Sequence, residues 1–119
     1  MHKFRKLKTW QKAMEFITSV YKVTATYPKY ELYGLIDQIR RAAVSIALNI
    51  AEGSGSGSDK EFCRFLRISL RSIYEVITGM EVAIRLRYGV EQENKNLIDD
   101  ADEIGAMLTG LIKSLTTES

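Results

Sequence analysis

The sequence predicts an all-α fold, an antiparallel up-down-up-down four-helix bundle. Apolar residues recur at three- and four-residue steps in four separate segments, and no segment alternates like a strand. Short connections between these segments make consecutive helices antiparallel neighbours. The chain has 119 residues, the length of one domain. We therefore expect residues 1–119 to form a single bundle domain with a basic N-terminal arm over residues 1–8.

The first helix is expected to begin at Thr9, whose hydroxyl suits an N-cap, and to stop near Thr26. Pro28 sets the end, because proline disfavours helix at the residue before it. Apolar residues recur at helical spacing between these limits: Trp10, Ala13, Met14, Ile17, Val20, Tyr21 and Val23.

The second helix is the most informative segment, because it is apolar on most of its circumference. It is expected to start between Tyr33 and Leu35 and to end at Gly53 in the left-handed conformation that often follows a helix. One apolar stripe comprises Ile39, Ala42, Ala43, Ile46 and Ile50, a second comprises Val44, Leu48 and Ala51, and a narrow polar strip comprises Arg41, Ser45, Asn49 and Glu52. A surface helix is normally apolar on one side only. Other subunits are therefore expected to cover the second stripe.

Residues 53–58 alternate glycine and serine, and we interpret them as a flexible connector. Ser58 and Glu61 form a capping-box pattern at the start of the third helix, expected over residues 59–87. Its seam comprises Phe62, Leu66, Ser69, Ile73, Val76, Met80 and Ala83, and the fourth helix has Leu97, Ala101, Ile104, Leu108, Leu111 and Leu115.

The net charge of +2 hides an asymmetry along the chain. Residues 1–90 carry 15 Lys/Arg and 8 Asp/Glu, whereas residues 91–119 carry 2 and 7. Two groups of cations are candidate phosphate contacts: Lys3, Arg5, Lys6 and Lys8 in the arm, and Lys60, Arg64, Arg67 and Arg71 as one stripe on the third helix. The competing hypothesis is that these arginines pair with acids of a neighbouring helix or subunit.

The sequence offers little for catalysis or metal binding. His2 is the sole histidine, which excludes a Ser-His-Asp arrangement, a Cys-His pair and a multi-histidine metal site. Cys63 is the sole cysteine and is expected to be a small packing residue. The carboxylates Asp99, Asp100, Asp102 and Glu103 are explained by the dipole of their helix. We therefore expect no enzyme activity, no cofactor and no metal.

The cysteine count also bears on the compartment. One cysteine allows no disulfide within the chain, which suits a reducing environment. The basic first residues are not followed by an apolar signal-peptide core, and no run reaches the length of a membrane span. A cytoplasmic protein that does not associate with membranes is expected.

Several motifs resemble the four-helix bundle proteins called 23S rRNA-intervening sequence proteins. The most specific are the run Arg40-Arg41-Ala42-Ala43-Val44-Ser45-Ile46 and the sequence Asn49-Ile50-Ala51-Glu52-Gly53. Phe4, Leu7 and Trp10-Gln11-Lys12-Ala13, Tyr33-Gly34-Leu35, Phe62 with Arg64-Phe65-Leu66, and Ser72 with Glu75 fit as well. The similarity extends over nearly the whole chain.

The resemblance implies a bundle that assembles into a ring, typically a homopentamer. The family takes its name from reading frames inside insertions in bacterial large-subunit ribosomal RNA genes, and it implies no general activity. More distant relatives, the accessory proteins of diversity-generating retroelements, bind nucleic acid and a reverse transcriptase.

The function expected from sequence and resemblance together is a non-enzymatic oligomeric binding or scaffold protein, with RNA or DNA as the favoured partner besides the chain itself. The alternative is an adaptor whose basic surface docks an acidic protein. The residues expected to serve the oligomer or the structure are Arg40, Arg41, Val44, Leu48, Asn49 and Glu52. In particular, Arg41 and Glu52 are expected to be buried and paired, with Arg64, Arg67 or Arg71 as candidate partners in the same or a neighbouring subunit.

Overall fold

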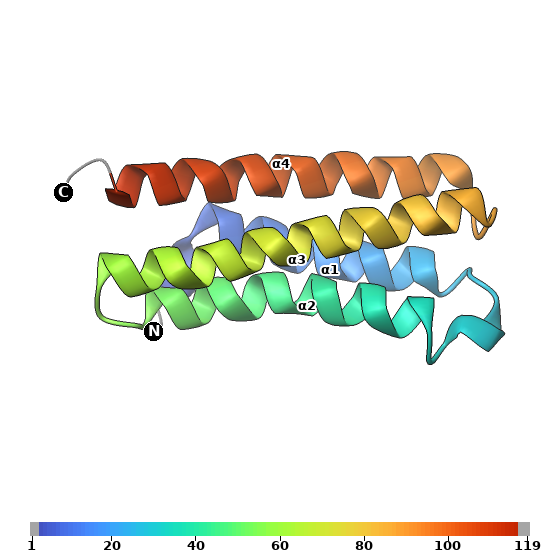
Figure 1. Ribbon diagram of the computed structural model, residues 1–119, viewed down its shortest axis with the longest axis horizontal. Helices are drawn as coiled ribbons and strands as arrows, with labels where there is room; N and C mark the ends of the chain where they lie inside the picture. The colour runs from blue at the N-terminus through green and yellow to red at the C-terminus, as the bar shows by residue number, and fades with distance from the viewer. Residues whose placement is uncertain (1–2, 117–119) are drawn as a thin grey trace.

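The computed structural model describes residues 3–116 and confirms the four-helix bundle (Figure 1). The chain forms a 3-10 helix η1 (Lys3–Lys6), α1 (Lys8–Thr24), a 3-10 helix η2 (Lys29–Glu31), α2 (Leu35–Ser54), α3 (Asp59–Arg85) and α4 (Glu91–Thr116). Each helix in Figure 1 runs opposite to the one before it, and the bundle measures 47 × 25 × 20 Å. Consecutive α-helices contact each other, and α1 also contacts α4.

The core lies along the bundle axis and receives side chains from all four helices. The predicted stripes of α2 and α3 supply much of it, including Ile39, Ile46 and Leu66, which are at most 1% exposed. The other fully buried large side chains are Ile50, Ile73, Met80, Ile104, Leu108, Val20 and Val76. Since burying such a side chain stabilises a fold by about 1.5–3 kcal/mol, this shared core holds the helices together.

Helices α2 and α3 approach closely because small residues line their contact. The hydroxyl of Ser69 donates to the carbonyl oxygen of Ile46 at 2.9 Å, and the hydroxyls of Ser72 and Ser45 are 3.0 Å apart. At Gly79, an added Cβ would lie 2.5 Å from Cγ1 of Ile39. These contacts fix the position of α3 along α2.

The helix ends correct three predictions. Thr9 is not an N-cap: α1 begins one residue earlier, and the Thr9 side chain is buried inside its first turn. Gly53 does not adopt a left-handed conformation after α2, because the helix continues through it to Ser54. It instead permits a close approach, since a Cβ there would lie 2.8 Å from Cβ of Phe65. Helix α3 ends at Arg85, before the predicted limit, and Arg87 follows with a φ of 61°.

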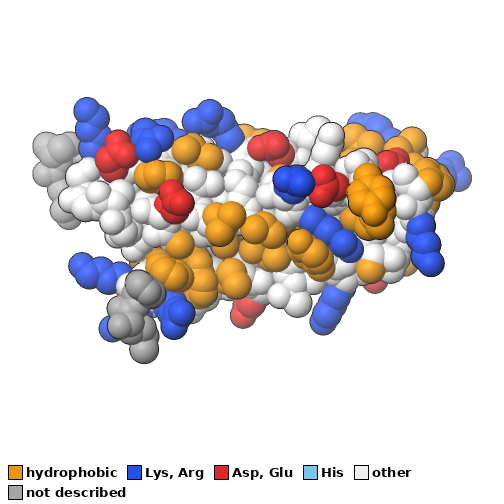
Figure 2. Space-filling model, turned by 90° about the horizontal axis from the view of Figure 1, so that it is seen from below, with side chains coloured by type: hydrophobic (Ala, Val, Ile, Leu, Met, Phe, Trp, Pro, Cys, Tyr) orange, Lys and Arg blue, Asp and Glu red, His pale blue; other side chains and the backbone are white. Residues whose placement is uncertain are grey.

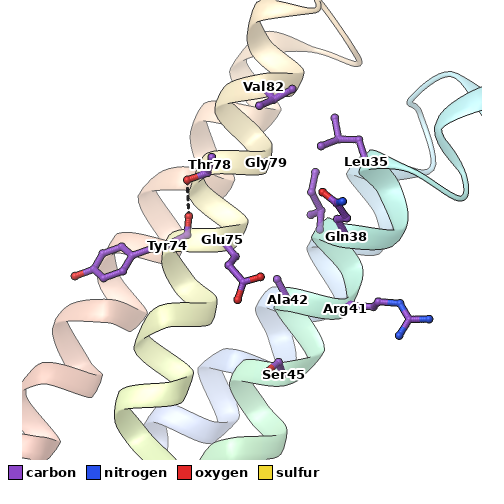
Figure 3. Close-up of a pocket in the computed structure, with 11 residues that line it drawn as sticks. Leu35, Gln38, Arg41, Ala42, Ser45, Tyr74, Glu75, Thr78, Gly79 and Val82 are labelled. Carbon is purple, nitrogen blue, oxygen red and sulfur yellow. Dashed lines mark hydrogen bonds between the residues drawn. The ribbon is translucent and has the colours of Figure 1, made fainter.

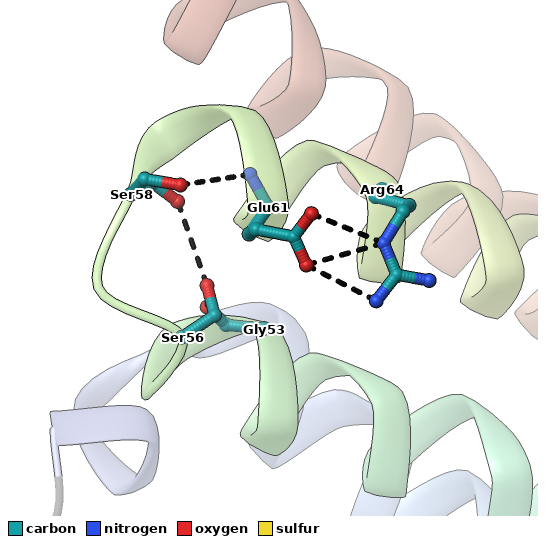
Figure 4. Close-up of polar contacts among 5 residues, drawn as sticks. All are labelled: Gly53, Ser56, Ser58, Glu61 and Arg64. Carbon is teal, nitrogen blue, oxygen red and sulfur yellow. Dashed lines mark hydrogen bonds and ion pairs between the residues drawn. The ribbon is translucent and has the colours of Figure 1, made fainter.

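At the start of α3, one of the two hydrogen bonds of the predicted capping box forms (Figure 4). The hydroxyl of Ser58 accepts a 3.1 Å hydrogen bond from the backbone N–H of Glu61. The Glu61 carboxylate, however, turns to Arg64, at 3.1 Å. The reciprocal bond expected from Glu61 is therefore replaced by an ion pair one turn along the helix.

Candidate nucleic-acid interface

The fold brings both predicted groups of cations to one end of the bundle. Helices α1 and α3 begin at that end, and α2 and α4 finish there (Figure 1). The arm residues Lys3, Arg5, Lys6 and Lys8 and the stripe residues Lys60, Arg64, Arg67 and Arg71 are all exposed. We call this end, defined by those eight residues, the basic end. Residues far apart in the sequence thus lie at or toward the same end, with Arg71 reaching the middle of α3.

The arm is held against the bundle by local contacts. The rings of Phe4 and Trp10 pack edge to face with centroids 5.0 Å apart, and the side chain of Gln11 donates to the carbonyl oxygen of Arg5 at 2.8 Å. Helix η1 contacts both α1 and α2. Because η1 is fixed in this way, its cations occupy a defined place at the end of the bundle where α3 begins.

Most charges of the basic end have no acidic partner within the chain. Arg64 pairs with Glu61 and lies 4.5 Å over the ring of Phe65. Among residues 3–116, Lys60, Arg67 and Arg71 make no ion pair, and neither do the arm cations. Among residues 3–116 none of these arginines pairs with an acid of α4, and pairing with an acid of another subunit stays a prediction.

The acidic α4 instead pairs with α1 at one point. Lys12 and Glu103 approach to 3.0 Å, and the hydrogen bond and charge of Glu103 raise the pKa of Lys12. Both side chains are about half exposed, so solvent screens the pair and it contributes little to stability. This contact leaves the cations of the basic end untouched.

The second stripe of α2 lies at the surface of the single chain. Leu48 is 60% exposed, and Val44 and Ala51 are partly exposed. Figure 2 views the side on which α2 lies and shows hydrophobic side chains along its middle. The predicted second apolar stripe therefore lies on this face, and no part of the chain from residue 3 to residue 116 covers it.

Arg41 and Glu52 are not buried, contrary to expectation. Arg41 is exposed and pairs at 2.9 Å with Asp37, one turn earlier on α2. Glu52 is exposed and makes no ion pair within the described chain. Both charges stay hydrated because the two ends of the polar strip are exposed, whereas Ser45 within the strip contacts Ser72 of α3.

Arg40 and Asn49 have structural contacts inside the chain. The Nε of Arg40 donates to the hydroxyl of Thr24 at 2.9 Å, and its guanidinium lies 4.5 Å over the ring of Tyr21. These contacts join α2 to α1. The side-chain amide of Asn49 donates to the carbonyl and hydroxyl oxygens of Ser45, at 2.9 and 3.0 Å.

Two grooves flank α2, and sequence reasoning did not identify either. The groove between α2 and α3 has a volume of about 730 Å³, and the groove between α1 and α2 about 600 Å³. In the first, Glu75 and Gln38 come from opposite walls (Figure 3). The second is lined by Tyr33, which is 92% exposed, and by Leu48, which lies farther along α2. The sequence signal was weak, because the small residues Ala42 and Gly79, which line the first groove, carry no pattern that distinguishes them from core residues.

The described part of the chain offers no cluster of side chains for a metal ion. Residues 3–116 contain no group of three or more His, Cys, Asp or Glu side chains placed to hold a metal ion. His2 lies outside the described residues. Cys63 is buried, with its sulfur 3.9 Å from the carbonyl oxygen of Ile112. None of the helices between residues 3 and 116 has the length and hydropathy required to cross a membrane.

Residues 5–110 match the family model of the 23S rRNA-intervening sequence protein. The chain belongs to this family. The match spans the second half of the arm, all of α1, α2 and α3, and most of α4. No functionally characterised protein matches the chain.

A solved structure supports the family assignment at the level of the fold. The chain is similar to a protein of unknown function from the S23 ribosomal protein family of Bacteroides thetaiotaomicron, whose crystal structure was determined at 1.70 Å resolution. The two share 25% sequence identity with a TM-score of 0.81, covering 88% of this chain and 95% of the other. This chain and the Bacteroides protein therefore share the fold of the whole bundle, not of one helical pair.

Proposed function

We propose that this family member is a non-enzymatic, cytoplasmic, oligomeric protein that binds RNA or DNA through its basic end. The observation that carries the proposal is that the arm and the α3 stripe start from the same end of the bundle, with all eight of their cations exposed and all but Arg64 unpaired within residues 3–116. Unpaired cations on one surface can neutralise phosphates and release counterions, which drives nucleic-acid binding.

The expected recognition is of the backbone rather than of the bases. Phosphate contacts position a protein on nucleic acid but carry no sequence information. Lysine and arginine dominate the basic end, and no base-reading motif accompanies them. If about five phosphates are neutralised, a fourfold rise in salt should weaken binding several hundredfold. Binding should therefore be salt-sensitive and only weakly selective for sequence.

A closed homo-oligomer, with the family resemblance favouring a pentamer, is part of the proposal. Its support is the exposed apolar stripe of α2, with Leu48 60% exposed at its centre. A stable interface covers roughly 800 Å² on each partner. The stripe and its two flanking grooves extend along a helix of 20 residues, about 30 Å long. Repeating the basic end around a ring would multiply a modest affinity per subunit.

Fluorescence anisotropy with structured RNA and with duplex DNA tests the nucleic-acid part. The triple variant Arg5→Glu, Lys6→Glu, Lys8→Glu should weaken binding to every sequence alike. The matched control reverses three exposed cations outside the basic end, Lys22, Lys29 and Arg85, and should bind within a few fold of the wild type. A flat titration of the wild type with both ligands at low salt would refute nucleic-acid binding and favour the adaptor function.

A further inference from the structure

We infer that the uncovered face of α2 docks onto the outer face of α3 in a second copy of this chain, head to tail. This inference rests on the oligomer in the proposed function and names its contact surfaces. The α2 strip is defined as Arg41, Val44, Leu48 and Glu52. The α3 strip is defined as Arg67, Arg71, Tyr74 and Glu75.

The α2 strip has the composition of an interface that lacks its partner. Its centre is apolar, with Leu48 60% exposed and Val44 partly exposed. A positive charge, Arg41, lies on one side of this centre, and a negative charge, Glu52, lies on the other. Of these two, Glu52 has no ion pair within residues 3–116.

The α3 strip presents the opposite pattern of charge. Tyr74 at its centre is 59% exposed, and Arg71 beside it has a long aliphatic stem that can cover apolar surface. Arg67 lies toward the basic end and Glu75 toward the other end, and both are exposed. Neither makes an ion pair in the described chain. Glu75 also lies on one wall of the groove of about 730 Å³ between α2 and α3 (Figure 3).

The two strips have a fixed relative height along the bundle. Gly53 lies beside Phe62 and Phe65, which puts Glu52 near the height of the first turns of α3 that carry Arg67. Farther along the bundle, Ser45 of α2 lies level with Ser72 of α3, and Ile39 of α2 lies level with Gly79 of α3. Arg41 lies between Ile39 and Ser45, and Glu75 lies between Ser72 and Gly79. These two residues therefore lie at matching heights.

A copy rotated about an axis parallel to the bundle keeps these heights. The α2 strip of one copy then meets the α3 strip of the next with Glu52 facing Arg67 and Arg41 facing Glu75. The apolar centre formed by Val44 and Leu48 faces Tyr74 and the stem of Arg71. The strips lie on two different helices, so the contact is heterologous. Such contacts form rings when the rotation closes.

A two-fold contact between two α2 strips would cover or pair fewer of these exposed residues. An antiparallel pair would set Glu52 against Arg41 and would use only the α2 strip of each copy. It would leave Tyr74 exposed and the charges of Arg67 and Glu75 unpaired. The head-to-tail contact satisfies all of these groups together. It also assigns Arg67 and Arg71 to the oligomer and leaves the arm, Lys60 and Arg64 for phosphates.

Charge exchange tests the pairing. Light scattering coupled to size-exclusion chromatography measures the mass of Glu52→Arg and of Arg67→Glu, each of which places like charges in contact. Each single variant should raise the dissociation constant about tenfold or more. The double variant Glu52→Arg with Arg67→Glu should restore the wild-type mass. A 1:1 mixture of the two single variants should also associate, because each supplies the surface that the other lacks. Circular dichroism confirms that each variant is folded, and Asp99→Arg, an exposed acid on α4, is the control that should not change the mass.

Other outcomes would overturn the inference separately from the proposed function. The two-fold contact would be established instead if Arg41→Glu restored the wild-type mass of the Glu52→Arg variant while Arg67→Glu left the mass unchanged. An oligomeric wild type that neither single variant weakens would overturn only the pairing of the strips. A monomeric wild type would overturn both the pairing and the oligomer, while the anisotropy titration would still decide nucleic-acid binding by itself.

Discussion

The hydroxyl of Tyr27 donates a 2.5 Å hydrogen bond to Oδ1 of Asn94, which joins the connection after α1 to the first turn of α4. Both side chains are buried, with Tyr27 3% exposed and Asn94 fully covered. The amide nitrogen of Asn94 in turn donates to the carbonyl oxygen of Tyr88 at 2.8 Å. The end of the bundle opposite the basic end is therefore closed by a buried polar network.

Tyr27 should make stability fall at alkaline pH. Burial raises its pKa from 10.0 to about 12, so the folded state holds the proton more tightly than the unfolded state. The stabilisation is complete below pH 10.0 and is lost as pH rises toward about 12. At about pH 11, the wild type should have lost roughly 1.4 kcal/mol from this residue. Urea unfolding at several pH values measures the loss.

Tyr27→Phe is the control for that experiment. It should be less stable than the wild type at neutral pH by about 1–3 kcal/mol, because Oδ1 of Asn94 loses its donor. Its stability should then fall less steeply than that of the wild type between about pH 9 and about pH 11. Parallel curves for the two proteins would show that Tyr27 does not account for the alkaline loss.

Gly53→Ala should destabilise the bundle although alanine favours helix. A Cβ at Gly53 would lie 2.8 Å from Cβ of Phe65 and 3.2 Å from the carbonyl oxygen of Phe62, so the backbones of α2 and α3 must separate. Such overpacking costs about 1–3 kcal/mol. Gly110→Ala is the matched control, because nothing lies within 4 Å of its added Cβ. It should stabilise by up to about 1 kcal/mol. Thermal unfolding compares the two, and equal effects would contradict the close approach at Gly53.

Leu48→Glu should abolish assembly while leaving the subunit folded. The side chain is 60% exposed in the single chain, so a carboxylate there stays hydrated until a partner covers it. Light scattering should report a monomer, with a helical circular dichroism spectrum unchanged from the wild type. Met14→Glu, at an apolar position 42% exposed on α1, should keep the wild-type mass. An oligomer that tolerates Leu48→Glu would exclude this face from the interface.

Ser58→Ala should weaken the start of α3. The hydroxyl satisfies the backbone N–H of Glu61 at 3.1 Å, and losing an N-cap costs about 0.5–2 kcal/mol. Ser58→Asp should retain most of the stability, because its carboxylate can accept the same bond and favours the helix dipole. Chemical denaturation of the three proteins checks the order. Equal stability of the alanine and serine proteins would indicate that water replaces the cap.

The sequence by itself determined the fold class, the core stripes and the start of α3. Helical periodicity is a local property, and it places Ile39, Ile46 and Leu66 on buried faces without knowledge of their neighbours. The Ser58 cap is equally local, because the hydroxyl and the N–H of Glu61 are three residues apart. The motifs of α2 also sufficed to indicate the family to which the chain belongs.

Only the tertiary structure decided the contacts between helices. Gly53 read as a helix end, because its closeness to Phe65 depends on how α3 packs on α2. Glu52 read as a buried, paired charge, because periodicity does not tell which side of an apolar helix another helix of the same chain covers. The arm and the α3 stripe start from the same end of the bundle, and this likewise depends on the antiparallel course of α1, α2 and α3. Periodicity reports which face of a helix is apolar, whereas the packing of helices decides what that face meets.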